Sequence, residues 1–443
     1  MLHEQGIRPG DVVGLSLDQS PLHCIVILAL ARLGAVSVPV HPVLPQAQRE
    51  KLAAKYGIRA IVSHKDDYKI SGATFIKLDT LSAERGGADM VCTDFVPNVE
   101  TPFRISLSSG TTGEPKGVLF TQGYLLGRIE QTLYECDSHS RVIPFDVNFA
   151  LGLTFALGVL TVGGTVVFPR TYKPQGMIEA INLHAVTHTF LPPVMLLRMA
   201  AQLPDGGGIA FPSLKHLRVV GGATSRVLLD ALLAKFTPHV YVVYGLTELG
   251  AISIATPEIL AKWPNSSGKI QPWAKVDILN TADQTVPAGV AGEIRVMVEG
   301  MPTEYFKDAQ QSTSKFRNGW FYTGDFGQMS KDGELFIEGR IDDVINLDGH
   351  KLSPHHVENI LAQHPDVNEA VVFGLKDDAG EQSLAAAVIP NAGGIREDDL
   401  MEFAKQKLGM FYPKRIFVMR DFPRNPNGKV LRGKVPAAAL KMQ

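Results

Sequence analysis

The chain has 443 residues, a formal net charge of −2 and a hydrophobic content of 45%. Domains usually hold about 100–200 residues, so this length predicts two or more domains with buried cores. The balanced charge argues against nucleic-acid binding, which usually depends on a basic surface. Cys24, Cys92 and Cys136 lie far apart, which excludes a disulfide scaffold and a cysteine-rich zinc module. We therefore expect a globular protein of a reducing, cytoplasmic compartment.

The sequence predicts neither a signal peptide nor a transmembrane segment. The N-terminal residues lack a basic start and a long apolar stretch, which argues against a secretory signal. The stretch from Phe149 to Phe168 carries no charged residue. Its glycines and threonines, and the turn signal Gly163-Gly164 before β-branched residues, predict a buried helix, a turn and a strand.

Strands and helices alternate in the first part of the chain. The pattern predicts a strand at Asp11–Leu17, a helix at Pro21–Arg32, a strand at Ala35–Val40, a helix at Gln46–Tyr56 and a strand at Arg59–Ser63. This alternation is typical of parallel sheets covered by helices.

The same alternation returns in the middle of the chain. We expect a strand at Leu214–Val220, a helix at Arg226–Phe236 and a strand at Val240–Val243. In such sheets, ligands bind in the loops beyond the carboxyl ends of the strands.

The last third of the chain shows a different pattern of predicted strands and helices. Short strands and turns from Gly268 to Ile294 predict a small β-rich subdomain. A final unit near Asp342 shows a helix at Pro354–Gln363, strands at Glu369–Gly374 and Ser383–Ile389, a helix at Glu397–Leu408 and a strand at Arg415–Val418. We therefore expect an α/β fold. A large N-terminal domain, residues 1–341, holds stacked, mostly parallel sheets flanked by helices plus the β-rich subdomain, and residues 342–443 form a small, mobile α+β domain.

A stretch rich in glycine and hydroxyl groups follows the strand expected at Ile105–Leu107. It comprises Ser108, Ser109, Gly110, Thr111, Thr112, Gly113, Glu114, Pro115, Lys116 and Gly117. The glycines let the backbone approach a ligand closely, the hydroxyls donate to phosphate oxygens, and the lysine supplies a cation. Backbone N–H groups in such a turn form an anion-binding concavity. A P-loop is disfavoured because Pro115 precedes Lys116 and Gly117 follows it.

With this loop the chain resembles the adenylate-forming superfamily of acyl- and aryl-CoA synthetases, luciferases and peptide-synthetase adenylation domains. The resemblance continues in the family's order over nearly the whole chain. It implies ATP-dependent activation of a small carboxylic acid to an acyl-adenylate, release of pyrophosphate and transfer of the acyl group to a thiol. The implied cofactors are ATP, Mg²⁺ and CoA, or the phosphopantetheine of an acyl carrier protein as the alternative partner.

Two further segments match the superfamily near the nucleotide. Gly221-Gly222-Ala223 follows a strand, and the resemblance places Gly222 and Ala223 against the adenine and the acyl carboxylate. In Tyr244-Gly245-Leu246-Thr247-Glu248, the resemblance implies that Tyr244 stacks on adenine beside Gly245, that Thr247 binds phosphate and that Glu248 holds Mg²⁺. A carboxylate is a suitable ligand for this hard cation.

The resemblance assigns roles to residues around the domain boundary. Asp325, in Thr323-Gly324-Asp325, would accept both ribose hydroxyls, and Arg340 would contact ribose or phosphate. Asp342 would be the hinge residue that absorbs a large dihedral change. Gly349 and Lys351 would line the thiol tunnel.

Near the C-terminus, the loop Pro426–Arg432 matches the superfamily closely. Its Asn427-Gly428 pair favours a tight turn that presents Lys429. The resemblance implies that Lys429 is the catalytic cation that bridges the acid and the α-phosphate.

The acid pocket can be interpreted in two ways. The stretch from Phe149 to Leu153 resembles benzoate-CoA-ligase-like members, with Phe149 lining an apolar or aromatic pocket. Alternatively, Phe145-Asp146 resembles amino-acid adenylation domains, in which the aspartate pairs with an α-ammonium. We favour the first interpretation and include Asp146, Phe149, Gly222 and Gly245 in the predicted pocket. A buried Asp146 should have a partner, because an unpaired buried charge is costly.

The chain departs from the superfamily in its shortened N-terminal front and in Asn346, where many members carry a lysine. These departures keep two alternatives to a CoA ligase open: an enzyme that loads an aryl, acyl or amino acid onto a carrier protein, and an inactive nucleotide-binding protein. His184 and His188 lack further zinc ligands, and no GxSxG elbow is present. The acid, the thiol acceptor and the oligomeric state stay open.

Overall fold

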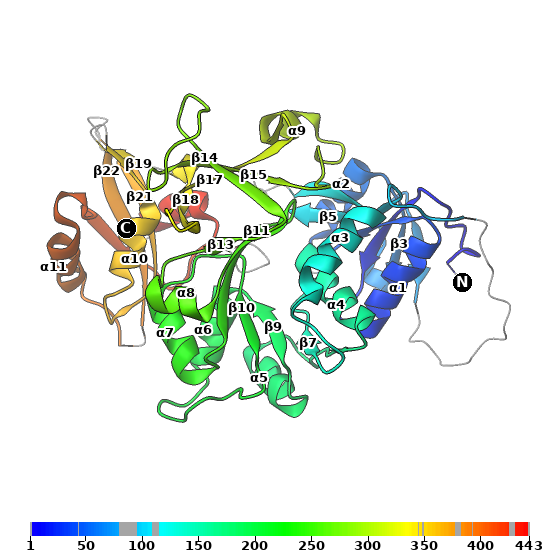
Figure 1. The fold of residues 1–443 in the computed structure, drawn as a ribbon, viewed down its shortest axis with the longest axis horizontal. Helices are drawn as coiled ribbons and strands as arrows, with labels where there is room; N and C mark the ends of the chain where they lie inside the picture. Colours follow the sequence, from blue (N-terminus) through cyan, green and yellow to red (C-terminus); the bar gives the residue numbers. More distant parts are fainter. Residues whose placement is uncertain are drawn as a thin grey trace.

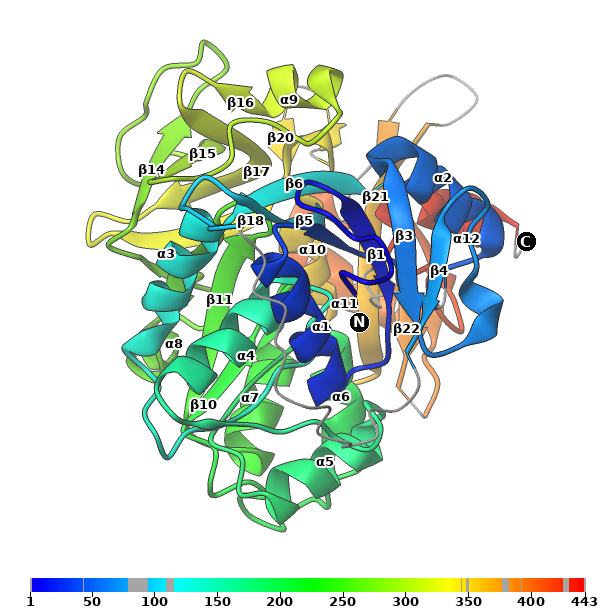
Figure 2. The ribbon, with the colours of Figure 1, turned by 90° about the vertical axis from the view of Figure 1, so that its right-hand side faces the viewer.

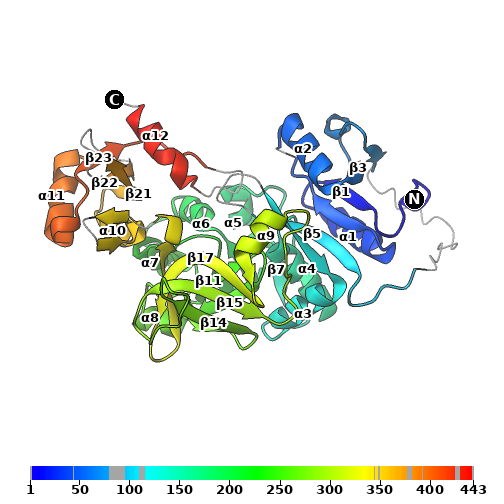
Figure 3. The same ribbon diagram turned by 90° about the horizontal axis from the view of Figure 1, so that it is seen from above.

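The structure is a computed structural model. It describes residues 2–42, 44–78, 95–108, 115–343, 345–347, 350–376, 382–391, 393–424 and 430–441. Within these residues, four sheets and their helices are arranged with the N-terminal unit at one end and the C-terminal unit at the other (Figures 1 and 3). The predicted α/β fold class is confirmed.

The first sheet has six strands in the order β4-β3-β1-β2-β5-β6. The first five run parallel, and β6 pairs antiparallel with β5. The strands are β1 (Val12–Ser16), β2 (Val36–Pro39), β3 (Ile58–Ser63), β4 (Thr74–Lys77), β5 (Pro102–Ser108) and β6 (Lys116–Thr121).

Helices cover both faces of this sheet. On one face, α1 (Pro21–Arg32) and α3 (Gln122–Leu133) bury apolar side chains such as Ile27 and Ile129 against the strands. On the other face, α2 (Gln46–Tyr56) packs with Leu52 and Tyr56. The bounds of α1 and α2 match the predicted ones. Proline at the first turn of α1 suits a helix start because its φ is already helical.

The second sheet has the strand order β14-β15-β17-β18-β13-β12-β11-β10-β9-β7-β8, with β16 paired to β17. The segment from β8 to β11 is parallel and the rest is antiparallel. The strands expected as a β-rich subdomain therefore extend this sheet. They are β7 (Arg141–Ile143), β8 (Thr165–Val166), β9 (His188–Leu191), β10 (His216–Val219), β11 (Val240–Leu246), β12 (Gly250–Ala255), β13 (Gly268–Ile270), β14 (Ala274–Leu279), β15 (Gly292–Val298), β16 (Phe316–Arg317), β17 (Trp320–Met329) and β18 (Glu334–Arg340).

Helix α4 (Ala150–Thr161) lies with α3 between the two sheets (Figures 1 and 2). Its Phe155 packs on Phe190 of β9, and its Ala156 clusters with Cys24 of α1. The predicted helix, turn and strand in this uncharged stretch are thus confirmed as α4 and β8. In the described residues, no helix combines the length and the apolarity that crossing a membrane requires.

The opposite face of the second sheet is covered by four helices, which bury Leu196, Leu228 and Leu232 against Leu217 and Val240. These helices are α5 (Pro174–Leu183), α6 (Pro193–Ala200), α7 (Arg226–Lys235) and α8 (Pro257–Lys262). Helix α9 (Ala309–Lys315) contacts β16 and β17.

The C-terminal unit is a three-stranded sheet with helices on both faces. Helices α10 and α11 share one apolar cluster with the sheet, and α12 packs on the other face. The elements are the hairpin β19 (Ile345–Leu347) and β20 (His350–Leu352), the sheet β21 (Val367–Lys376), β22 (Gln382–Pro390) and β23 (Arg415–Val418), and the helices α10 (Pro354–Leu361), α11 (Glu397–Leu408) and α12 (Val435–Leu440). Short 3₁₀ helices lie at Asp66–Tyr68, Ile341–Asp343, Gly409–Phe411 and Arg432–Lys434.

Candidate functional site

The predicted phosphate loop joins two antiparallel strands, because Ser108 ends β5 opposite Lys116 at the start of β6. The loop residues Ser109, Gly110, Thr111, Thr112 and Gly113 lie outside the described residues. Lys116 is 8% exposed, and its Nζ donates to Gln311 Oε1 at 2.8 Å. Burial lowers the pKa of Lys116, while the nearby charge of Glu248 opposes the shift. The structure thus holds this cation in place beside the carboxylate of Glu248.

The turn Thr247–Glu248 is held by three side chains that sequence reasoning missed. Tyr124 Oη donates to the Glu248 carbonyl at 2.6 Å, and Arg128 Nη1 donates to the Thr247 carbonyl at 2.9 Å. Both come from the buried face of α3, four residues apart and therefore on one side of the helix. The turn that carries the predicted metal ligand is consequently anchored to the layer between the two sheets.

The third of these side chains, Tyr305, contacts the Glu248 carboxylate itself. Tyr305 Oη donates to Glu248 Oε1 at 2.7 Å, and the Lys116 ammonium lies 5.1 Å from the centre of the Tyr305 ring. Tyr305 and Glu248 are 3% and 5% exposed. Burial, followed by the negative charge of Glu248, raises the pKa of Tyr305, so its hydroxyl is a donor at neutral pH.

The chemistry of Glu248 suits a magnesium ion. Glu248 Oε1 is oriented by Tyr305, and no hydrogen bond or ion pair involves Oε2 in the part of the chain that the structure describes. No group of three or more potential metal-ligating His, Cys, Asp or Glu side chains occurs among the described residues. A site with one protein carboxylate matches the usual coordination of Mg²⁺, which binds one or two carboxylates and completes its coordination with phosphates and water.

A second cluster joins Tyr244, Asp325 and Arg340. Tyr244 Oη donates to Asp325 Oδ2 at 2.6 Å, and Arg340 Nη1 donates to Asp325 Oδ1 at 2.8 Å. Arg340 also donates to the Thr323 carbonyl at 2.8 Å. Burial raises the pKa of Tyr244, with the charge of Asp325 adding to the shift. Because a carboxylate offers about four acceptor positions, Asp325 retains capacity for ribose hydroxyls.

Two of the predicted glycine positions have structural reasons of their own. Gly245 sits at an irregularity in the β11–β12 pairing, where an added Cβ would lie 2.4 Å from the Gly250 carbonyl oxygen. At Gly222, a Cβ would meet the Pro193 ring at 3.3 Å. The loop Gly221–Ala223 leaves the carboxyl end of β10, where ligands collect in parallel sheets. Ala223 is exposed there.

Asp146 has the partner that its burial predicted. Its Oδ1 accepts hydrogen bonds from Gln19 Nε2 and from the Asn148 backbone at 2.8 Å, and its Oδ2 lies 3.8 Å from His41 Nε2. Burial raises the pKa of Asp146. These contacts commit the carboxylate to the turn that precedes α4, whose N-cap residue is Phe149. Whether Phe149 or Asp146 contacts the acid stays a prediction.

The boundary between the large and small units carries the predicted hinge. Asp342 lies in the 3₁₀ helix Ile341–Asp343, between β18 and β19. Gly349 and Lys429 lie outside the described residues, and Lys351 is placed only as a β20 residue opposite Asn346. The roles of these residues stay predictions.

Arg432, three residues after Lys429, connects the segment after the predicted catalytic loop to the rest of the C-terminal unit. Arg432 Nη1 donates to Glu358 Oε2 at 3.0 Å, and Arg432 Nε lies 3.4 Å from Asp343 Oδ2. His355 Nδ1 lies 2.9 Å from the same Glu358 oxygen. This network ties the segment after the loop to α10 and to the hinge region.

Comparison with known proteins identifies the family. The family model for AMP-binding enzymes matches residues 1–306, and the model for the C-terminal domain of AMP-binding enzymes matches residues 356–429. The chain belongs to the AMP-binding enzyme family. The predicted superfamily and the prediction of an enzyme are confirmed.

The relatives of this AMP-binding enzyme include an oxalate–CoA ligase of Arabidopsis thaliana. That ligase is 29% identical over 98% of this chain and 89% of its own length. A 4-coumarate–CoA ligase of Nicotiana tabacum is 27% identical, over 97% of this chain and 85% of its own.

Solved structures support the fold. An amide bond synthetase of Marinactinospora thermotolerans, 24% identical, superposes with a TM-score of 0.88 over 99% of this chain and 91% of its own. An O-succinylbenzoate coenzyme A synthetase of Bacillus subtilis in complex with ATP and magnesium ion, also 24% identical, gives 0.87 over 98% and 91%.

Proposed function

We propose that this AMP-binding enzyme uses ATP and Mg²⁺ to activate a carboxylic acid as an acyl-adenylate and then transfers the acyl group to the thiol of CoA. The observation that carries the proposal is the convergence of Lys116, Glu248, Tyr244, Asp325 and Arg340, from four separate segments, in two adjoining clusters. The names of the curated CoA-ligase relatives support the choice of a thiol acceptor.

In the first half-reaction, a carboxylate oxygen of the acid attacks the α-phosphorus of ATP, and the bond to pyrophosphate breaks. Two anions must meet, so the site must supply positive charge. Lys116 and Lys429 are the side chains proposed for this task, and Asp325 and Arg340 hold the ribose. Mg²⁺, when bound at Glu248, would neutralise phosphate charge.

In the second half-reaction, the CoA sulfur attacks the acyl carbon, AMP leaves with the bonding electron pair, and the thiol proton passes to solvent. We propose that the C-terminal unit turns about Asp342 between the two steps and brings the hairpin with Gly349 and Lys351 toward the thiol. Such gating motions are common in enzymes. A carrier-protein phosphopantetheine would enter by the same route, so the acceptor must be determined by experiment.

The decisive experiment is acid-dependent ATP–pyrophosphate exchange over a panel of aryl, fatty and amino acids, followed by thioester formation with free CoA or with a carrier protein. Glu248→Gln should lower exchange by at least about 100-fold, since even outer-shell partners of a metal site are worth 10–100-fold. Glu299→Gln, an exposed position after β15, is the matched control and should retain exchange. Absence of exchange with every acid would refute the proposal and favour an inactive nucleotide-binding protein.

A further inference from the structure

Two cavities border the second sheet. The smaller lies between its strands and the helices α3 and α4, and the larger lies among β10 to β13, α8 and the residues that follow α3. The smaller, of about 20 Å³, is lined by side chains that include Arg128, Leu151, Phe155 and Arg218, together with Ala251 of β12. Arg128, which lines it, donates to the Thr247 carbonyl next to Glu248. Leu151 and Phe155 share an apolar cluster with Val220, which precedes the loop Gly221–Ala223. This cavity therefore lies beside the turn that carries the candidate metal ligand and near the loop expected to contact the acyl carboxylate.

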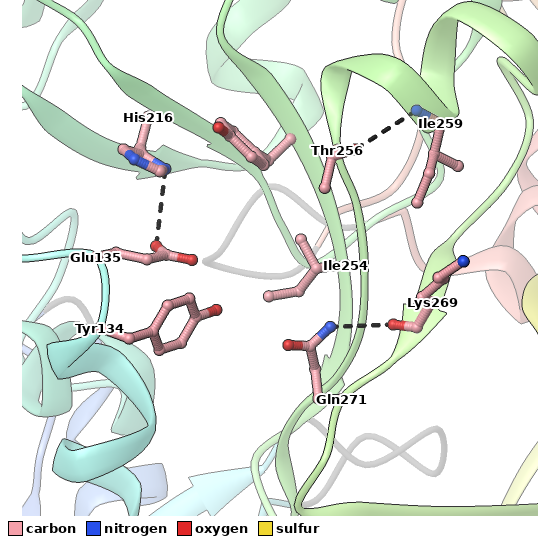
Figure 4. Close-up of a pocket in the computed structure, with 9 residues that line it drawn as sticks. Tyr134, Glu135, His216, Ile254, Thr256, Ile259, Lys269 and Gln271 are labelled. Atoms are coloured by element: carbon pink, nitrogen blue, oxygen red, sulfur yellow. Dashed lines mark hydrogen bonds and ion pairs between the residues drawn. The ribbon is translucent and has the colours of Figure 1, made fainter.

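The larger cavity, of about 520 Å³, adjoins the smaller one, because Tyr134 and Ile254 line both. Figure 4 shows its wall, in which Glu135 and His216 face each other, and His216 Nδ1 lies 3.7 Å from Glu135 Oε2. The cavity lies toward the amino ends of the parallel strands. Its residue Tyr241 precedes Tyr244 by three positions on β11, a rise of about 10 Å at roughly 3.3 Å per residue.

The boundary between the cavities is an ion pair. Arg218 of β10 pairs with Glu135, which follows α3, and the Arg218 guanidinium lies 4.7 Å from the centre of the Phe155 ring. The side chains of Arg218 and Glu135 are 6% and 8% exposed. Arg218 Nε and His216 Nδ1 are buried without a hydrogen-bond partner among the described residues. These unused donor and acceptor positions border the cavities.

The charges around the smaller cavity do not balance. Arg128 and Arg218 are both buried and stay protonated at neutral pH. Against these two cations stands Glu135, the single carboxylate paired with either of them in the described part of the chain. The charge of Glu248 also acts on Arg128, but that carboxylate is engaged by Tyr305 and is the proposed metal ligand.

The nearby imidazoles do not alter this balance. Burial lowers the pKa of both His188 and His216 to about 4, so both rings are neutral at pH 7. A buried excess cation is costly unless an anion pairs with it.

We propose that Arg128 and Arg218 form the far end of the acid pocket and select dicarboxylic acids, whose second carboxylate pairs with them. This inference rests on the proposed function. Leu151 and Phe155 contact the apolar body of the acid, while the second carboxylate accepts hydrogen bonds from the guanidinium groups. The smaller cavity alone holds a group of about the size of one water, so the larger cavity beyond Tyr134 supplies the room that a carboxylate needs.

The test compares matched pairs of acids in ATP–pyrophosphate exchange with the wild-type enzyme. Each pair has the same length and differs in the distal group: straight-chain monoacids and diacids of four to nine carbons, benzoate with terephthalate, and cinnamate with its 4-hydroxy and 4-carboxy derivatives. We expect kcat/KM for the best diacid to exceed that of its monoacid by about tenfold or more, since hydrogen bonds to charged groups are among the strongest.

Variants separate the charge effect from a structural one. Glu135→Gln increases the excess positive charge and should raise the diacid-to-monoacid ratio severalfold, whereas Glu130→Gln, at an exposed position on α3, should leave it unchanged. Arg128→Met should abolish the preference for diacids. The readout is the diacid-to-monoacid ratio and not the activity itself, because Arg128 also donates to the Thr247 carbonyl, so its loss affects both kinds of acid. Replacing the pair together, with Glu135→Met and Arg218→Met, preserves the net charge and avoids an unpaired buried ion. This double variant should lower the diacid-to-monoacid ratio without abolishing the preference, because Arg128 alone then pairs with the second carboxylate.

The outcomes distinguish this inference from the proposed function. If no diacid exceeds its monoacid at any length while exchange proceeds, or if the hydroxylated acid is preferred, the distal site is refuted and the ligase function stands. An unchanged ratio in both Glu135→Gln and Arg128→Met would also refute it. No exchange with any acid would refute the ligase function itself.

Discussion

Tyr305→Phe removes a single hydroxyl group, the one that orients the Glu248 carboxylate. That hydroxyl donates at 2.7 Å to Oε1, and both side chains are nearly fully buried, so water cannot easily replace the donor. A hydrogen bond to a charged group contributes about 1.5–3 kcal/mol net. Because each 1.4 kcal/mol is a factor of ten, full loss of this orientation corresponds to a fall of about 10- to 150-fold.

We expect this loss in kcat/KM for acid-dependent pyrophosphate exchange, together with a rise in the Mg²⁺ concentration that gives half-maximal exchange. The assay is a Mg²⁺ titration of exchange at fixed ATP, with thermal unfolding measured in parallel. Tyr322→Phe is the matched control, because its hydroxyl donates at 3.1 Å to Asp283, a carboxylate outside the candidate site. The control should change stability without changing the Mg²⁺ dependence.

A wild-type Mg²⁺ titration and wild-type kcat/KM in Tyr305→Phe would refute the reasoning. The Glu248 carboxylate would then be oriented by its backbone anchors alone. An equal loss of exchange in Tyr322→Phe would show instead that general destabilisation, and not the orientation of Glu248, lowers the activity.

The remaining predictions concern the C-terminal unit and its hinge. Lys429→Ala should abolish adenylate formation but largely spare thioester formation from preformed acyl-adenylate; an equal loss in both would contradict its role. Asp342→Pro should slow thioester formation more than adenylation, because proline fixes φ at the hinge, and stopped-flow of the two half-reactions measures this. Burial raises the pKa of Glu358, but His355 and Arg432 outweigh it and lower the pKa from 4.5 to about 2. The stability that Glu358 contributes is therefore complete above pH 4.5 and lost as the pH falls toward 2, which acid unfolding of wild type against Glu358→Gln would detect.

Much of the fold follows from local sequence patterns. The predicted bounds of α1, α2, α11 and β23 agree with the structure residue for residue. These segments have clear periodicity and are bounded by proline, glycine or polar residues. The strand expected at Val240–Val243 instead continues to Leu246, because antiparallel pairing with β12 holds Tyr244 and Gly245 in the sheet. That pairing is not local, so the sequence pattern near the motif does not reveal it.

The same reason explains the strands after Gly268. Their short lengths and turns predicted a small β-rich subdomain of the large domain, and the structure adds that hydrogen bonds from β13 to β12 and β18 join these strands to the second sheet. Strand pairing across such intervals depends on the register of distant segments. A sequence pattern therefore identifies the strands without identifying the sheet to which they belong.

The candidate site shows a similar division. Resemblance to the superfamily identified Glu248 and Asp325, because each lies in a short sequence motif. It missed Tyr124, Arg128 and Tyr305, which reach Thr247 and Glu248 from segments 57 to 124 positions away. The sequence did hold a signal for two of them. Arg128 lies one helical turn from Tyr124, on a face that includes Leu125 and Ile129, and an arginine on such an apolar face needs a specific partner because a buried charge is costly. Helix α3 was not among the predicted elements, so this signal went unused.

Helix α3 connects Glu248, the proposed metal ligand, to the far end of the proposed acid pocket. Arg128 both donates to the Thr247 carbonyl and lines the smaller cavity, and Glu135, just beyond the helix, pairs with Arg218 there. An acid whose distal carboxylate binds Arg128 would share that guanidinium with the turn that carries Glu248. Binding of the distal carboxylate would then affect the turn that carries Glu248, the proposed metal ligand, through the Arg128 side chain. It follows that a diacid should lower the Mg²⁺ requirement of exchange relative to its monoacid, and that Arg128→Met should remove this difference.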